Sequence, residues 1–317
     1  MAETPHKKKR AFSLPKENLR LLLAAIKPIP FIPFEGRFQE YKGRIAPMEN
    51  LTMISPVKSF LFPDGAESFR FNLKGQAVVK KGNAQKEKIV FGVNPLDILA
   101  LETLESIFRK NPAYSGRRKA TLIIGMGDYS RAGAAFDVFF HDNGLDYLAV
   151  AGTPRGERFL AKYRKFFGAT DTQVPETGRR DSLLIDPEKL REAVKNAPKE
   201  VWEEVARTCL GCGICSYVCP LCYCFEVDDS VPIGEKTGAR CTRWDSCMLE
   251  SFSAVAGGHV FQKELSSRIK NWYYHKFARA TAERGTPDCV GCDRCFHFCP
   301  VAINFREVLS KCQSKSR

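Results

Sequence analysis

The chain has 317 residues, of which 44% are hydrophobic and 27% are charged, and this length and balance predict a globular protein with two domains. No apolar run reaches the roughly 18 residues that a membrane-spanning helix needs, and the N-terminus lacks the apolar core of a secretory signal, so we expect a cytoplasmic protein without a membrane span. The formal net charge of +13 would suit a nucleic-acid ligand, but the basic residues are scattered and form no recognised nucleic-acid motif, so we expect no nucleic-acid partner.

Three regions follow one another along the chain. Residues 1–18 are polar and charged without a hydrophobic period, and we expect them to form a disordered basic tail. Residues 19–181 alternate short apolar runs with turn residues and helical patterns, which predicts an α/β domain. Residues 182–317 are mostly helical in pattern and contain all 13 cysteines.

The elements of the α/β domain can be placed from its apolar runs. Buried strands are predicted over residues 88–93 and 120–125, with a helix over residues 96–108 between them. A third strand is expected over residues 145–151, followed by a helix over residues 156–167.

A turn that contains two glycines follows the second predicted strand. Its sequence is Gly125-Met126-Gly127-Asp128, which lacks the third glycine of a dinucleotide-binding fingerprint and any Gly-Lys-Ser/Thr. An ordinary turn from strand to loop is the better interpretation, and we expect no nucleotide site in this chain.

The cysteines after residue 208 include two copies of one motif. The copies are Cys209-Leu-Gly-Cys212-Gly-Ile-Cys215-Ser-Tyr-Val-Cys219-Pro220 and Cys289-Val-Gly-Cys292-Asp-Arg-Cys295-Phe-His-Phe-Cys299-Pro300. Both have the spacing C-x2-C-x2-C-x3-C-P, which is typical of proteins that bind two [4Fe-4S] clusters. A zinc ribbon would use two C-x2-C pairs and would give no reason for the third cysteine or the Cys-Pro ending. We therefore predict two [4Fe-4S] clusters.

In proteins with this spacing, three cysteines of a motif bind one cluster and the fourth binds the other cluster. One cluster is thus predicted to be held by Cys209, Cys212, Cys215 and Cys299, and the other by Cys289, Cys292, Cys295 and Cys219. Because thiolates occupy every iron, no position is open to a substrate, and single-electron transfer is the expected function. Each oxidised cluster with its thiolates carries a charge of roughly −2, so part of the basic excess is expected to offset this charge.

Four further cysteines follow the first motif, at Cys222, Cys224, Cys241 and Cys247. They suit a third site, for another cluster or for a zinc ion, with Cys247 at the start of a helix; they suit equally well free thiols that pack around the clusters. Cys312 fits no spacing pattern and is expected to be a free thiol. We expect His259, His275 and His297 to be ordinary helical or surface histidines and not ligands.

Segments with apolar residues at helical spacing lie before the first cysteine motif and between the two motifs. Helices are predicted over residues 188–193 and 197–208 before the first motif, and over residues 244–256 and 260–282 between the two motifs. The aromatic residues of the last two segments are interpreted as core; they are Phe252, Phe261, Trp272, Tyr273 and Phe277. Residues 182–317 are therefore predicted to form an α-helical ferredoxin domain that holds two clusters, and the fold class is α+β overall.

Several short segments outside the two motifs form, when taken together, a pattern that can be compared with known protein families. They are Leu221-Cys222-Tyr223-Cys224-Phe225, Arg243-Trp244-Asp245-Ser246-Cys247, Ala256-Gly257-Gly258-His259-Val260-Phe261 and His275-Lys276, with Pro56 to Pro63 and Phe91 to Asp97 in the N-terminal half. With these segments the chain resembles an iron-sulfur protein family that comprises the A-type subunit of anaerobic sulfite reductase and the beta subunit of cytoplasmic NiFe sulfhydrogenases. Members of that family often have cysteine where Leu96 stands, so we expect no N-terminal metal site here.

The resemblance implies an electron relay inside a larger complex. In this family the relay connects a flavoprotein, which oxidises NAD(P)H and carries FAD and a [2Fe-2S] centre, with a catalytic subunit that reduces sulfite, sulfur or protons. We therefore expect a non-catalytic electron-transfer subunit of a cytoplasmic oxidoreductase complex. The alternative is a catalytic iron-sulfur subunit that reduces a sulfur compound or a disulfide at a third cysteine-ligated site.

Overall fold

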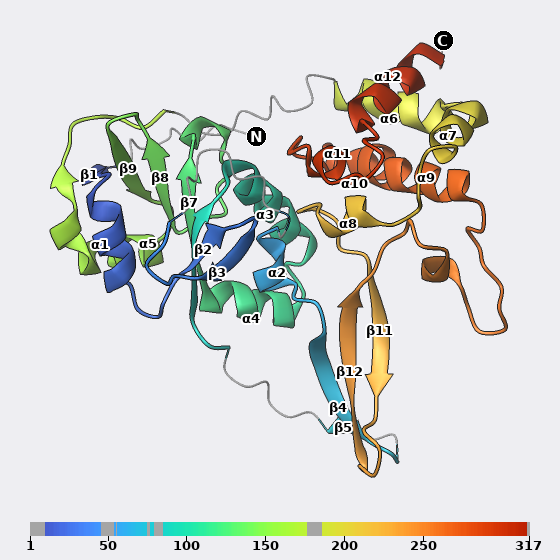
Figure 1. The fold of residues 1–317 in the computed structure, drawn as a ribbon, viewed down its shortest axis with the longest axis horizontal. Coiled ribbons are helices and arrows are strands. Elements are labelled where there is room, and N and C mark those ends of the chain that lie inside the picture. Colours follow the sequence, from blue (N-terminus) through green and yellow to red (C-terminus); the bar gives the residue numbers. More distant parts are fainter. Residues whose placement is uncertain are drawn as a thin grey trace. The chain divides into compact units, whose positions relative to one another are not determined.

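A computed structural model describes residues 10–45, 54, 56–74, 77–78, 85–175 and 186–315. The chain divides into two compact units, one made of residues 1–57 and 84–180 and the other of residues 58–83 and 181–317. Figure 1 shows helices and sheets in the chain, which confirms the predicted α+β class. The unit that contains the cysteines differs from the predicted one, because residues 58–83 of the N-terminal half also belong to it.

The first unit is built on an eight-stranded sheet. In order across the sheet, the strands are β10 (Gly168–Ala169), β1 (Ala11–Pro15), β9 (Asp146–Ala151), β8 (Val138–Asp142), β7 (Thr121–Gly127), β6 (Lys88–Val93), β2 (Phe31–Phe34) and β3 (Arg37–Glu40). Strands β2, β6, β7 and β8 are parallel to one another, and the other neighbours pair antiparallel. The apolar runs of β6 and β7 are almost entirely buried, as is usual for parallel strands that are covered on both faces.

Helices connect and cover these strands. They are α1 (Asn18–Ala25), α3 (Pro95–Ile107), α4 (Pro112–Ala120), η1 (Tyr129–Arg131), α5 (Pro154–Lys162) and η2 (Arg164–Phe166). Helix α3 begins where the sequence predicts it, because the Asn94 side chain accepts a hydrogen bond from the backbone N–H of Leu96 at 2.9 Å and Pro95 occupies the first turn. The three strands and two helices predicted for this region are confirmed, with small shifts at their ends.

Part of the predicted basic tail is ordered. Residues Ala11–Pro15 form β1, which pairs antiparallel with β9 and with β10. Leu14 is fully buried in the core of the first unit, and α1 already begins at Asn18. The prediction of a disordered tail is therefore wrong for residues 11–18, while residues 1–9 lie outside the described residues.

The second unit combines an antiparallel sheet with helices. The sheet has the order β11 (Phe225–Ser230), β12 (Thr237–Trp244), β4 (Ala66–Asn72) and β5 (Ala77–Val78). The helices are α2 (Lys58–Leu61), α6 (Pro187–Asn196), α7 (Lys199–Ala206), α8 (Ile214–Tyr217), η3 (Glu250–Ser253), α9 (Leu265–Tyr273), the π-helix η4 (Tyr274–Arg279), α10 (Ala280–Arg284), α11 (Arg294–His297) and α12 (Phe305–Lys315). Trp202, Tyr273, Phe277 and Cys312 lie in one hydrophobic core of this unit.

The helix predicted over residues 244–256 is wrong. Trp244 ends strand β12, and the segment that follows contains only the short 3₁₀ helix η3. Phe252 and Phe261 are 38% and 68% exposed, so these two aromatic residues are not core, whereas Trp272 and Phe277 are buried as predicted. The second predicted helix is present but begins at Leu265, five residues after Val260 and not at it.

The helices in the described part of the chain include none that is long and apolar enough to cross a membrane.

Candidate metal centre

The two cysteine motifs adopt the same local backbone conformation. Gly211 and Gly291 both have φ near +63°, and the residues that precede the short helices α8 and α11, Gly213 and Asp293, are also left-handed, with φ of +77° and +57°. Glycine is required at position 213 for a second reason, because a Cβ atom there would lie 2.8 Å from the Cβ atom of Ser246. The repeated sequence thus folds into a repeated loop.

In each loop, backbone N–H groups point at cysteine sulfurs. The N–H of Gly211 donates to Cys209 Sγ and the N–H of Gly291 donates to Cys289 Sγ, both at 3.4 Å. The last cysteine of each motif also accepts a backbone hydrogen bond at 3.4 Å, from Leu221 to Cys219 and from Ile303 to Cys299. Donors at these positions stabilise negative charge on sulfur, which is what thiolate ligands of a cluster require.

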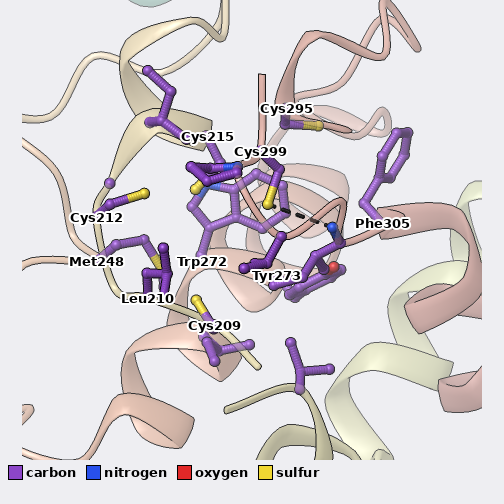
Figure 2. A pocket seen from close by; sticks show the side chains of 17 residues that line it. Cys209, Leu210, Cys212, Cys215, Met248, Trp272, Tyr273, Cys295, Cys299 and Phe305 are labelled. Carbon is purple, nitrogen blue, oxygen red and sulfur yellow. Dashed lines mark hydrogen bonds between the residues drawn. The ribbon is translucent and has the colours of Figure 1, made fainter. Parts of the chain in front are cut away.

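One cavity brings cysteines of both motifs together. It has a volume of about 60 Å³, and the cysteines that line it are Cys209, Cys212, Cys215, Cys295 and Cys299. Figure 2 shows these sulfurs around the cavity, with Trp272 and Tyr273 of α9 and Phe305 of α12 among the other side chains. Four of the five cysteines are the set predicted for the first cluster, and Cys299 is the member that comes from the other motif.

Electrostatic interactions between thiols also connect the two motifs. Burial raises the pKa of the Cys295 thiol, and the neighbouring thiols of Cys289 and Cys219 raise it further. Burial likewise raises the pKa of Cys209, and the Cys299 thiol of the other motif adds to the effect. Cys209, Cys289 and Cys295 therefore each have the last cysteine of the other motif as an electrostatic neighbour, whereas the neighbours of Cys215 belong to its own motif.

Two lysines are buried beside these sulfurs. The Nζ atom of Lys276, a residue that is only 5% exposed, donates to Cys219 Sγ at 3.2 Å and to the carbonyl oxygen of Asp288 at 2.8 Å. Lys58 is 3% exposed; its Nζ atom donates to the carbonyl oxygen of Cys222 at 2.5 Å and lies 4.5 Å from the centre of the Trp244 ring. Both lysines belong to the second unit.

Charge near Cys219 favours its thiolate form. A hydrogen bond with the Cys222 thiol and the nearby ammonium groups of Lys276 and Lys58 hold the pKa of Cys219 well below its ordinary value, although burial acts in the opposite direction. Burial lowers the pKa of Lys276 as well, but the thiols of Cys219 and Cys222 outweigh burial and raise it above the ordinary value. A thiolate and an ammonium group thus stabilise each other at this position.

Three of the four further cysteines lie at one cavity. Cys222, Cys224 and Cys247 line a second, small cavity, whereas Cys241 is not among its lining residues. Cys241 lies within strand β12, where it pairs with Asp228 on one side and Glu67 on the other. A third site made of all four cysteines thus stays a prediction, whereas the prediction that Cys247 begins a helix is wrong, because Cys247 lies in a turn.

Among the described residues, no three His, Cys, Asp or Glu side chains converge closely enough to hold one metal ion. A tetrahedral zinc site needs four ligand atoms within about 2.3 Å of the ion. A [4Fe-4S] cluster needs no such convergence, because each thiolate binds a different iron atom.

Sequence reasoning missed the contribution of the two buried lysines. Lysine side chains are almost always exposed, so the presence of lysine at position 58 or 276 gives no reason to expect a buried charge there. The burial of Lys276 could have been predicted from its position between Tyr273 and Phe277, on the buried side of the helical segment. Of the histidines, His275 alone lines the second cavity, and burial lowers its pKa.

Comparison with known proteins agrees with this geometry. Residues 208–303 match a family described as a 4Fe-4S dicluster domain, a range that contains both cysteine motifs. Sulfhydrogenase 2 subunit beta from Pyrococcus furiosus is 30% identical over 290 residues, which cover 82% of this chain and 83% of that protein. No solved structure is significantly similar to the chain. The chain carries a [4Fe-4S] domain of the ferredoxin type and belongs to the sulfhydrogenase beta-subunit family of iron-sulfur electron-transport proteins.

Proposed function

We propose that this chain is a non-catalytic electron-transfer subunit of a cytoplasmic oxidoreductase complex and that two [4Fe-4S] clusters carry its electrons. The observation that supports this best is the cavity lined by three cysteines of the first motif together with Cys295 and Cys299 of the second. The first cluster is then held by Cys209, Cys212, Cys215 and Cys299, and the second by Cys289, Cys292, Cys295 and Cys219. The helices that carry these residues form the α-helical ferredoxin domain.

The proposed ligation suits electron transfer and not substrate chemistry. Four thiolates per cluster leave no iron open to a substrate. Because each motif contributes ligands to both clusters, the two clusters are close neighbours, which favours transfer of single electrons between them. The apolar side chains of Trp272, Tyr273 and Phe305 border the first cavity and limit the access of water to it.

The proposed partners follow from the family. The relative is one subunit of a sulfhydrogenase, and this supports a complex of several subunits for our chain. We infer that a flavoprotein oxidises NAD(P)H and passes electrons to this chain, which delivers them to a catalytic subunit of the hydrogenase or of the sulfite or sulfur reductase type.

The test measures the activity of the anaerobically purified chain, first alone and then together with the rest of its native complex. Alone, it should oxidise no NAD(P)H and reduce no sulfite, sulfur or protons, because it supplies only the relay. With the flavoprotein present, NAD(P)H should reduce its clusters, which is visible as loss of absorbance and as new electron paramagnetic resonance (EPR) signals. Steady NAD(P)H oxidation or sulfur reduction by the isolated chain would overturn the proposal in favour of a catalytic subunit.

A further inference from the structure

A third cavity lies in the first unit, which contains no cysteine and therefore no part of the relay. Its volume is about 300 Å³, which is large enough for a small organic ligand. The residues that line it come from the segment after α1, the start of β6, the junction of α4 and β7, and helix α5. Four segments that are far apart in the sequence thus form one concave site within this unit.

Positive charge surrounds the third cavity. Its cationic lining residues are Lys27, Lys88, Lys119, Arg155, Arg158 and Lys162, against the single carboxylate of Glu87. Arg155, Arg158 and Lys162 follow one another at intervals of three and four residues along α5, so they lie on one face of the helix. Within the described part of the chain, none of the six cations takes part in a salt bridge. A concave surface with charge of one sign attracts ligands of the opposite sign.

The buried residues of the same lining are apolar or aromatic. Ile89, Leu122, Phe159 and Tyr163 are all buried, and the rings of Phe159 and Tyr163 lie 4.8 Å apart. The Tyr163 hydroxyl accepts a hydrogen bond from the backbone N–H of Lys27 at 3.1 Å, which ties the segment after α1 to the end of α5. The third cavity therefore combines exposed cations with an apolar interior.

This combination determines the chemical class of the ligand. Guanidinium groups bind phosphate through paired hydrogen bonds, and a phosphate group carries a charge of about −1.5 to −2 at neutral pH. Two phosphate groups offset most of the excess positive charge, whereas a single carboxylate does not. We propose that the third cavity binds a small organic diphosphate, with its phosphate groups on Arg155, Arg158 and Lys162 and its ring or apolar part against Phe159.

The shape of the site favours a small molecule over a macromolecule. A nucleic-acid backbone requires basic side chains along an extended surface, whereas here they surround a bounded volume with buried aromatic rings. The site also differs from the turn Gly125–Asp128. That turn lies at the carboxyl end of β7, and the third cavity lies at its amino end, so the expected absence of a nucleotide at the turn does not bear on the cavity.

Isothermal titration calorimetry of the full chain at low salt, with ADP as the probe, tests this proposal. ADP should bind at a single site, inorganic pyrophosphate should bind more weakly, and adenosine should not bind. The double variant Arg158→Glu with Lys162→Glu should weaken ADP binding at least about tenfold, because it removes charge-assisted hydrogen bonds to phosphate. Arg155 is left unchanged, since its guanidinium group donates to the carbonyl oxygen of Lys119 at 2.5 Å.

A matched control has the same change in charge outside the cavity. Lys110→Glu with Lys165→Glu alters two exposed residues of the first unit that do not line the third cavity, and it should bind ADP as the unmodified chain does. Both double variants change exposed side chains, so their midpoints of thermal unfolding should stay close to that of the unmodified chain. Iron content should also be unchanged in both, because the first unit contains no cysteine.

The outcomes separate this inference from the proposed function. Absence of ADP binding at millimolar concentrations would overturn it, as would equal weakening in the two double variants, which would indicate non-specific attraction. Pyrophosphate that binds as tightly as ADP would refute the role of the apolar interior. Tighter binding of a polyglutamate peptide than of ADP would assign the site to an acidic protein segment instead. Failure of electron transfer with ADP binding intact would contradict the proposed function alone.

Discussion

Replacing Lys276 by methionine should lower the reduction potential of the second cluster. The Lys276 ammonium group donates to Cys219 Sγ at 3.2 Å, and Lys276 is 5% exposed, so solvent hardly screens the interaction. Reduction adds negative charge to the cluster and its sulfurs, which a nearby ammonium group stabilises. Methionine keeps most of the buried volume and removes both the charge and the hydrogen bond.

The size of the effect can be estimated from this one contact. A hydrogen bond to a charged group contributes about 1.5–3 kcal/mol. Because the bond is present in both redox states, only its strengthening on reduction counts, and we take half of that energy, about 0.8–1.5 kcal/mol. For a one-electron couple a tenfold change in the equilibrium constant corresponds to about 59 mV, so the potential should fall by about 30–65 mV.

The measurement is a redox titration of the purified chain followed by EPR, with the two clusters resolved as separate components. The first cluster is the internal comparison, because the hydrogen bonds to Cys209 and Cys299 come from the backbone N–H groups of Gly211 and Ile303, which Lys276→Met leaves in place. Lys276 acts on the first cluster only through its charge near Cys215, so the potential of that cluster should fall less. Lys276→Arg retains a positive charge and should shift the second cluster less. An unchanged potential in Lys276→Met, or an equal fall for both clusters, would refute the reasoning.

Two further substitutions test the loops and the core. Gly213→Ala should lower the iron content by about four irons per chain, because the residue has φ of +77° and its new Cβ would lie 2.8 Å from Ser246 Cβ. Gly234→Ala is the matched control, with φ of +83° and no atom within 4 Å of the new Cβ, and should cost only about 1 kcal/mol of stability with all iron retained. Cys312→Ala removes a fully buried thiol of α12 and should lower the midpoint of thermal unfolding while iron content stays unchanged, whereas loss of iron would show that Cys312 is a ligand.

Local signals explain which elements could be predicted from the sequence. Strand β6 and helix α3 follow from a short apolar run and from the cap formed by Asn94 and Pro95, all within neighbouring residues. Strand β1 is only five residues long and depends on pairing with β9, more than 130 residues away, so no local pattern reveals it. The helix predicted after Trp244 fails for a similar reason, because the Trp244 backbone N–H donates to Asp64 and its side chain donates to the carbonyl oxygen of Phe62.

The same distinction applies to the candidate site. Cysteine spacing is a local property, and it predicts a grouping of Cys209, Cys212, Cys215 and Cys299, all of which line the first cavity together with Cys295. Which of the additional cysteines lie together depends instead on the hairpin of β11 and β12, which carries Cys241 away from the second cavity. The buried ammonium groups are equally non-local, because Lys58 reaches Cys222 from a segment 164 residues earlier in the chain.

The crossed ligation of the two clusters is tested most directly by EPR of Cys219→Ala. Cys219 belongs to the first motif in sequence, but Lys276, Cys289 and Cys295 surround it in the structure. Our account predicts that this substitution damages the cluster held by Cys289, Cys292 and Cys295, and that the cluster held by Cys209, Cys212 and Cys215 keeps its signal and its potential. Selective loss of the cluster held by Cys209, Cys212 and Cys215 would contradict it.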